Sequence, residues 1–406
     1  MTWKDFHPIP LRKDGKIQLS GAGIQWLTRA YFYQIPQEVY GKLLPKVKDI
    51  LKIKRARYMI KPKFDITNKI NNYLLEIERA RGFLDAAKLK EEWVRDMQSE
   101  ALILEAHHST HIEGTQLTLS QAKRILTGKS IKGVRKDDRQ ELINYKDAMH
   151  LVSEYLGKKS EVTDDLIKQI HKIIVKDVRG GTLEPGRYRK VQNYVVNSLT
   201  REIIYTPPPP SEVPKLMKEF VEWLNGETNI SPVLMAGISQ YQFVDIHPFL
   251  DGNGRTARVL CTLILYQNGY DFKRLFSLSE YYDKNRRKYY DAIQSVRNNK
   301  MDMTGWLEYF TEGLQNQLLE VKTKGEKAIK KEVIIEKAKR LNLNERQQKI
   351  LIYLLNRKRC SVENIRLKFN LVRRTVQRDL SKLIDLGLIQ EISKSKTDPT
   401  RYYELL

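Results

Sequence analysis

Residues 247–258 read HPFLDGNGRTAR and join two apolar stretches that both predict helices. The stretch before this segment ends near Ile246, and the stretch after it begins at Arg255. A glycine-rich turn that leads into a helix exposes backbone N–H groups at the positive end of the helix dipole, and such a turn binds phosphate. The segment therefore predicts an anion site between two helices.

The side chains of this turn are those that phosphoryl or nucleotidyl transfer requires. Arg255 and Arg258 are three residues apart, so they share a helix face and can hold one anion together. His247 can accept a proton near neutral pH, and Asp251 offers the oxygen ligand that hard cations prefer. A base, a metal-binding carboxylate, an anion hole and two arginines together indicate an enzyme of this class.

Length and composition limit the class of protein. The chain has 406 residues, with 72 Lys and Arg against 49 Asp and Glu, which gives a net charge of +23. This length predicts about two to four domains, and 41% hydrophobic residues with 30% charged residues exclude global disorder. We find no apolar run long enough for a membrane helix, no signal-peptide stretch, and only Cys261 and Cys360, so we expect a cytoplasmic protein without membrane contact. The positive charge suits a polyanionic partner, but by itself it indicates only solubility and non-specific attraction to polyanions.

Helical periodicity and turn signals divide the chain into four parts. Residues 1–100 predict a mostly helical N-terminal lobe. Residues 101–315 predict a helical catalytic core with a short helix at 105–114 and a β-hairpin at 192–206, which turns near Asn197–Arg201. Residues 316–340 predict a helical linker, and residues 341–406 predict three helices and two strands, the order of a winged helix-turn-helix domain. The expected fold class is mainly α.

The segment 247–258 resembles the signature of the Fic (filamentation induced by cAMP) family, His-Pro-Phe-x-Asp/Glu-Gly-Asn-Gly-Arg-x-x-Arg, at every defined position. The likeness extends over residues 100–310 and implies a Fic-type helical core in which the hairpin is a flap. It also implies a protein adenylyltransferase that transfers AMP from ATP to a Ser, Thr or Tyr hydroxyl of a target protein, or of itself, and releases pyrophosphate. The target would add a strand to the edge of the flap. Such binding depends on main-chain hydrogen bonds more than on side chains, so the sequence leaves the identity of the target open.

The resemblance further implies a role for each residue of the signature. His247 would be the base that deprotonates the target hydroxyl, and Asp251 would hold Mg²⁺ between the α- and β-phosphates. Arg258 would contact the γ-phosphate. The other implied nucleotide contacts are the amides around Gly252, Asn253 and Gly254, the side chain of Asn253 at the α-phosphate, Arg255 on the β-phosphate side, and Tyr289 and Tyr290 near the nucleoside.

Three positions leave the nucleoside contacts open. Tyr289 and Tyr290 match a tyrosine pair of the family, but they fit equally well as part of a helix core. An Asn that the family often has further along is Arg297 here, a departure that affects the expected adenine contacts.

Upstream, residues 109–114 read STHIEG and resemble the family's inhibitory motif Ser/Thr-x-x-x-Glu-Gly/Asn. Its position before the catalytic motif is typical of the class with an N-terminal inhibitory helix. The implied brake consists of Ser109, Glu113 and Gly114. Glu113 would pair with Arg258 and keep this arginine from the γ-phosphate, so ATP would bind in an unproductive pose.

In the C-terminal part, Arg373, Arg374, Gln377 and Arg378 recur at helical spacing and form one basic face, which suits a DNA major groove and its phosphates. The segment resembles winged helix-turn-helix domains of bacterial regulators, and the alternative is a module for protein interaction or dimerisation, so a homodimer stays open.

Two further readings of the whole chain stay open. One is a nucleotide-sensing, DNA-binding transcriptional regulator. The other is a Fic enzyme with different chemistry, which removes AMP or transfers phosphate or phosphocholine. The presence of His247 favours an enzyme, because a regulator that only binds a nucleotide needs no base.

Overall fold

The computed structural model describes residues 61–157, 161–178, 184–196, 202–226, 229–395, 398 and 400–406. Residues 1–60 of the predicted N-terminal lobe and the predicted hairpin turn at Asn197–Arg201 lie outside the described residues. The described chain divides into two compact units. One comprises the described residues up to Asp85 together with Val94–Leu319, and the other comprises Ala86–Trp93 with Glu320–Leu406.

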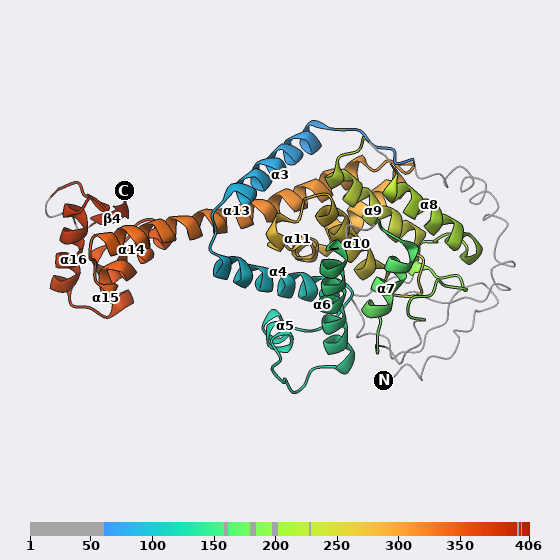
Figure 1. The fold of residues 1–406 in the computed structure, drawn as a ribbon, viewed down its shortest axis with the longest axis horizontal. Helices are drawn as coiled ribbons and strands as arrows, with labels where there is room; N and C mark the ends of the chain where they lie inside the picture. Colours follow the sequence, from blue (N-terminus) through green and yellow to red (C-terminus); the bar gives the residue numbers. More distant parts are fainter. Residues whose placement is uncertain are drawn as a thin grey trace. The chain divides into compact units, whose positions relative to one another are not determined.

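The first unit is built almost entirely of helices (Figure 1), so the mainly helical class predicted from the sequence is confirmed. Two short 3₁₀ turns, η3 (Pro210–Glu212) and η4 (Phe272–Arg274), lie between them. The helices are α3 (Asn68–Ala86), α4 (Glu91–Ile112), α5 (Leu119–Leu126), α6 (Lys136–Leu156), α7 (Asp164–Ile174), α8 (Val213–Asn225), α9 (Pro232–Ile246), α10 (Asn253–Gln267), α11 (Leu278–Lys284), α12 (Arg286–Asn298) and the beginning of α13 (Thr304–Arg340).

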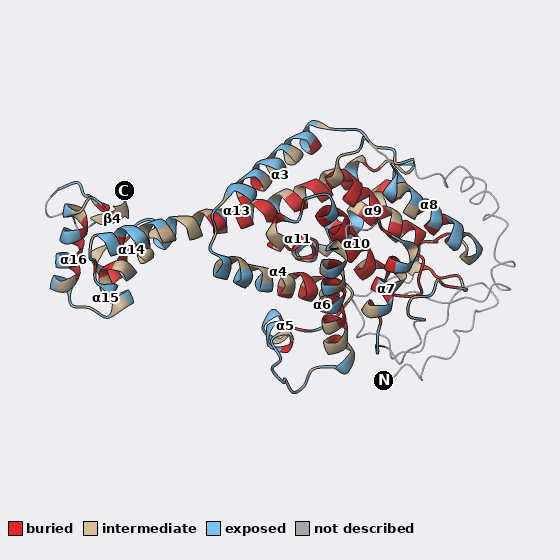
Figure 2. Cartoon of the chain, viewed as in Figure 1, coloured by how far each residue is buried: buried red, intermediate tan, exposed pale blue. Residues whose placement is uncertain are grey.

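Helices α9 and α10 form the centre of this unit, and both are buried along nearly their whole length (Figure 2). A helix that is apolar on all sides is stable only when other elements surround it. Helices α6 and α7 pack against α10, and α8 packs against α9. The sequence of α7 determines both where this helix begins and which of its faces is buried. Thr163 caps its first turn by accepting from the Leu166 N–H, and Leu166, Ile170 and Ile174 bury one face. The loop between α9 and α10 therefore rests on a rigid base.

Two short antiparallel strands lie within the segment predicted to form the hairpin. They are β1 (Val195–Val196) and β2 (Ile203–Tyr205), paired through Val195 with Tyr205 and Val196 with Ile203. Ile203 and Ile204 are exposed, whereas Tyr205 is buried and its hydroxyl donates to the Asp245 carbonyl oxygen at 2.6 Å. The hairpin is thus joined to the C-terminal turn of α9.

The second unit contains the rest of α13, from Glu320 to Arg340, then three further helices and two antiparallel strands in the predicted order. The elements are α14 (Glu345–Arg357), α15 (Val362–Phe369), α16 (Arg373–Asp385), β3 (Ile389–Ile392) and β4 (Tyr402–Leu405). Their core contains Ile350, Leu354, Ile365, Leu380 and Leu383. Among the described residues, no helix is both long enough and apolar enough to cross a membrane.

Candidate active site

Three residues within the loop between α9 and α10, namely His247, Gly252 and Asn253, contribute to its conformation. α9 ends at His247 in the left-handed region (φ 52°, ψ 58°), and Gly252 precedes α10 with φ 76°. A Cβ on Gly252 would lie 2.8 Å from Val175 Cγ1, so both the backbone conformation and the available space require glycine. Asn253 closes the loop, because its Oδ1 accepts from the Phe249 N–H at 3.0 Å and its Nδ2 donates to the Phe249 carbonyl at 2.9 Å. Both ends of the Asn253 amide are therefore engaged, and its predicted phosphate contact stays a prediction.

His247 is buried and oriented by its own helix. Its Nδ1–H donates to the Val244 carbonyl at 3.2 Å, so this tautomer carries the lone pair on Nε2. Burial, together with smaller contributions from the neighbouring Arg189 and Arg297 charges, lowers the pKa of His247 to about 3. The imidazole is thus neutral at pH 7, as a proton acceptor must be.

Arg189 fixes the backbone of this loop, and sequence reasoning missed it. Its Nε donates to the His247 carbonyl at 2.8 Å, its backbone N–H donates to the Pro248 carbonyl at 2.9 Å, and its Nη2 donates to the Pro208 carbonyl. The side chain is 2% exposed, and each contact is to a carbonyl oxygen. Arg189 therefore links the loop between α9 and α10 to the proline run that follows the hairpin.

His171 supports the other end of the loop. Its Nε2–H donates to the Asp251 carbonyl at 3.0 Å, its Nδ1 accepts from the Gly186 N–H at 3.0 Å, and its ring stacks on Phe249 with centroids 3.6 Å apart. Burial lowers the pKa of His171 to about 3, with a smaller contribution from Arg255. His171 is therefore a buried core histidine with both ring nitrogens engaged.

Arg255 lies wholly inside the protein, between two carboxylates. Its Nη1 is 3.0 Å from Glu141 Oε2, and its Nη2 is 3.5 Å from Asp251 Oδ1. Asp251 Oδ1 also accepts from the Gly252 N–H at 2.5 Å. Arg255 therefore positions Asp251, and its predicted contact on the β-phosphate side stays a prediction.

Asp251 offers a single carboxylate to a cation. The described residues contain no group of three or more His, Cys, Asp and Glu side chains that could hold a metal ion by themselves. Magnesium is commonly bound by one or two carboxylates together with substrate phosphates and water. The Asp251 carboxylate fits a magnesium ion of this kind, and its predicted role in holding Mg²⁺ stays a prediction.

Arg258 is engaged by the segment predicted to be the brake. Its Nη2 donates to Glu113 Oε1 at 2.8 Å and to the Ser109 carbonyl at 2.9 Å, and its Nε donates to Ser109 Oγ at 2.7 Å. Burial alone would lower the pKa of Arg258, but the Glu113 carboxylate, with smaller contributions from two tyrosines, raises it above its ordinary value. The arginine side chain is 3% exposed and that of Glu113 is 21% exposed, so the pair is largely shielded from water.

The Glu113 carboxylate also lies against the first turn of α10. A Cβ added at Gly254 would overlap with Glu113 Oε1 and lie 3.2 Å from Arg258 Nη1. The first N–H groups of a helix have no intrahelical acceptor, and the helix dipole favours an anion there. An anionic group of the protein itself therefore occupies the place where the sequence predicts phosphate.

The helix that carries this carboxylate is longer than predicted. Instead of a short helix over 105–114, α4 has 22 residues and ends at Ile112. Gly114 follows with φ 98°, a conformation that glycine adopts without strain, and its N–H donates to the His111 carbonyl. The glycine of the motif therefore turns the chain away directly after Glu113.

A second anchor holds the end of α4. His108 Nδ1 and His111 Nδ1 lie 2.8 and 2.7 Å from Asp283 Oδ2, and Arg286 Nε donates to Asp283 Oδ1 at 2.6 Å. Burial works against the charge of Asp283, but these three partners lower its pKa below the ordinary value. The segment predicted to be the brake is thus attached both to α10 and to the α11–α12 segment.

The two predicted nucleoside tyrosines lie in different surroundings. Tyr289 is 2% exposed, stacks on Tyr282 with centroids 4.4 Å apart, and accepts from Gln240 Nε2 at 3.3 Å. Tyr290 is 40% exposed. The first packs as helix core, as the alternative interpretation allowed, and the nucleoside contact of either tyrosine stays a prediction.

Arg297 packs beside the hairpin. Its guanidinium lies 3.6 Å from the centroid of the Tyr205 ring, and its Nε donates to Asp245 Oδ1 at 3.1 Å. Asp245 is two residues before His247. Arg297 therefore links α12 to both β2 and the end of α9.

The predicted DNA contacts of the second unit lie on the outer face of α16. Arg373, Arg374, Gln377 and Arg378 are exposed, whereas Val376, Asp379, Leu380 and Leu383 are buried.

Comparisons with known proteins agree with this geometry. Residues 161–265 match the Fic/DOC family. Similar curated proteins include Protein adenylyltransferase Fic of Drosophila willistoni, 33% identical over 200 residues, which are 48% of this chain and 38% of the relative. The protein of the same name from Drosophila erecta is 32% identical over 210 residues, which are 51% of this chain and 41% of the relative. The chain thus spans about two fifths of the length of the curated relatives it matches.

Solved structures show the same fold. A Fic family protein from Desulfovibrio desulfuricans G20 aligns with a TM-score of 0.54 at 23% identity, over 85% of this chain and 98% of that one. Fic-1 from C. elegans aligns with a TM-score of 0.53 at 26% identity, over 62% of this chain and 71% of that one.

Proposed function

Because the chain carries a domain of the Fic/DOC family, we propose that it is an autoinhibited protein adenylyltransferase. It transfers AMP from ATP to a Ser, Thr or Tyr hydroxyl of a target protein, and of itself, and releases pyrophosphate. The observation that carries this proposal is the position of the Glu113 carboxylate, which contacts Arg258 and the start of α10. A carboxylate in this position supports an anion site on the loop that begins at the neutral His247.

The residues act as follows. His247 Nε2 accepts the proton of the target hydroxyl, whose oxygen attacks the α-phosphorus. A new oxygen–phosphorus bond forms, the bond to the bridging oxygen of the β-phosphate breaks, and pyrophosphate leaves with that oxygen. The N–H groups at the start of α10 stabilise the charge on the transferred phosphate. Magnesium, when bound with ATP, would neutralise phosphate charge, and Asp251 would hold it.

Autoinhibition follows from competition for one site. Glu113 and the γ-phosphate of ATP are both anions that would pair with Arg258 and approach Gly254. While Glu113 is in place, the triphosphate lacks its terminal anchor, so its α-phosphate is not aligned for in-line attack. Release of α4 gives Arg258 to the nucleotide and starts transfer.

The target is proposed to dock on the hairpin. Ile203 and Ile204 are exposed apolar side chains on β2, beside Tyr205, which joins the hairpin to the end of α9. An extended segment that adds a strand here would bring a hydroxyl towards His247.

Parallel reactions with ATP labelled at the α- or the γ-phosphate test the proposed chemistry. We expect the α-label, and not the γ-label, to enter protein, and the incorporation to disappear in His247→Ala. Lys349→Ala is the control variant, because this lysine is exposed on α14 and lies outside the site. Transfer of the γ-label would show phosphate transfer instead. Release of AMP from modified protein, without incorporation, would show the reverse activity.

DNA binding by residues 341–406 is a second candidate function, and the exposed basic face of α16 favours it. We expect Arg374→Glu with Arg378→Glu to weaken DNA binding by the full chain, and the binding of the wild type to fall steeply with salt. The matched control is Lys339→Glu with Arg340→Glu, which makes the same change of charge at the exposed end of α13. Equal loss in both variants would show that net charge, and not α16, binds the DNA.

A further inference from the structure

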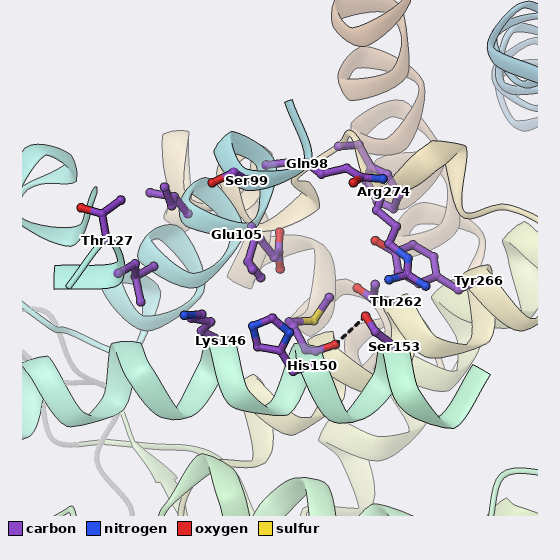
Figure 3. A pocket seen from close by; sticks show the side chains of 16 residues that line it. Gln98, Ser99, Glu105, Thr127, Lys146, His150, Ser153, Thr262, Tyr266 and Arg274 are labelled. Carbon is purple, nitrogen blue, oxygen red and sulfur yellow. Dashed lines mark hydrogen bonds between the residues drawn. The ribbon is translucent and has the colours of Figure 1, made fainter. Parts of the chain in front are cut away.

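A cavity of about 400 Å³ lies between α4, α6 and α10 (Figure 3). This volume is within the range of small-molecule sites. Leu102, Met149 and Phe276 contribute apolar wall. None of the residues to which the proposed reaction assigns a role lines this cavity.

Three positively chargeable side chains border the cavity. Lys146 and His150 project from α6, and Arg274 lies at the other side with its guanidinium beside the Tyr266 ring, 5.9 Å from its centroid (Figure 3). Within the described part of the chain, no carboxylate forms an ion pair with Lys146 or Arg274. Their charges are therefore available to a bound anion.

The one carboxylate in the lining, Glu105, forms its hydrogen bonds with the protein and does not pair with these positive charges. Glu105 Oε1 accepts from the Tyr145 and Ser279 hydroxyls, and Oε2 accepts from the Ser277 hydroxyl at 3.0 Å and the Ser279 N–H at 2.9 Å. Four donors satisfy both oxygens. Glu105 is thus committed to the protein wall and leaves the cavity with a positive character.

We propose that this cavity binds a small anion with an apolar or aromatic body, and that the bound ligand strengthens the brake. The anionic group pairs with Arg274 or Lys146, and the body packs against the apolar wall. The site itself is independent of the proposed transfer reaction, whereas the regulatory effect rests on the proposed role of Glu113.

The regulatory effect follows from which helices line the cavity. Glu105 is one turn before Ser109 on α4, and Thr262 of α10 donates to the Arg258 carbonyl at 3.1 Å. The cavity exists in the structure in which Glu113 and Arg258 are paired. In the proposed release of the brake, α4 moves, and the part of the cavity wall formed by Leu102 and Glu105 moves with it. A ligand that requires this wall therefore favours the paired arrangement, and by reciprocity it lowers the affinity for a nucleotide that requires Arg258.

The binding test uses 8-anilinonaphthalene-1-sulfonate, a fluorescent anion with an aromatic body, and the full chain. We expect one site, and about a tenfold rise of the Kd in Arg274→Gln and Lys146→Gln, because each removes a charge-assisted contact. Lys218→Gln is the matched control, because this lysine is 77% exposed on α8. Ser99→Trp, at an exposed lining position, should block entry without removing a charge. Equal dye binding in the wild type, Arg274→Gln and Ser99→Trp would overturn the site.

The coupling test measures the Kd of ATP by calorimetry with and without saturating dye. We expect the dye to weaken ATP binding at least fivefold in the wild type and to have no effect in Glu113→Gly. An unchanged Kd in the wild type, or an equal change in both proteins, would overturn the regulatory effect. Neither measurement uses AMP transfer, so failure of this site and failure of the proposed activity are distinguishable.

Discussion

Replacing Glu113 by Gly should raise AMP transfer by about 30-fold, and the contacts of Arg258 set this magnitude. Glu113 supplies one charge-assisted hydrogen bond of 2.8 Å to a guanidinium that is 3% exposed, while both Ser109 contacts remain in the variant. Such a bond contributes about 1.5–3 kcal/mol, and the 21% exposure of Glu113 places the value near the lower half of this range. About 2 kcal/mol corresponds to ~30-fold in the population of competent enzyme.

Glu113→Gln is the matched variant for this prediction. The amide keeps a hydrogen bond to Arg258 but loses the charge, so about 1 kcal/mol of the brake remains and transfer should rise only ~5-fold. The assay is incorporation of α-labelled AMP into the protein itself, at a fixed ATP concentration. Adding Arg258→Ala to Glu113→Gly should cancel the gain. A gain that persists without Arg258, or an equal gain in the Gln and Gly variants, would refute the reasoning.

Three other predictions concern the loop and its supports. His247→Ala should reduce transfer by about 10²–10⁴-fold and leave the Kd of ATP within a few-fold in calorimetry, because the phosphate site is untouched; near-normal transfer would exclude His247 as the base. His171 has a folded pKa of about 3, so between pH 6.5 and 3 only the unfolded chain gains a proton at this residue, and the free energy of unfolding decreases as the pH falls. His171→Asn should reduce this decrease by about 1.4 kcal/mol per pH unit, measured by urea unfolding. If the free energy of unfolding of the variant changes with pH as steeply as that of the wild type, the ring is not buried in its neutral form. Arg297→Met should lower the free energy of unfolding by about 3 kcal/mol because it leaves Asp245 buried without its cation; adding Asp245→Asn should restore part of this loss, and no restoration would mean that the stacking on Tyr205 carries the effect.

The loop from 247 to 258 could be predicted because its determinants are local. The turn, the glycine in the left-handed region and the start of α10 are all encoded within twelve residues. The pairing of Glu113 with Arg258 spans 145 residues, and only the resemblance to a family indicated it.

The residues that support the loop could not be predicted in this way. Arg189, His171 and Glu141 reach the loop from 58, 80 and 114 positions away in sequence. Arg189 and His171 bind backbone carbonyls, which every residue type offers, so no sequence pattern identifies the partner. The engagement of both ring nitrogens of His171 depends on the packing of α7 against the loop.

The contact between Glu113 and the start of α10 has a consequence for dynamics. A Cβ at Gly254 would overlap with Glu113 Oε1, so the carboxylate covers the start of α10, where the amide protons have no intrahelical acceptor. Their exchange rate then reports how often α4 lifts away in protein without nucleotide. Hydrogen exchange at the start of α10 can therefore measure how often the predicted brake opens before any ATP is added.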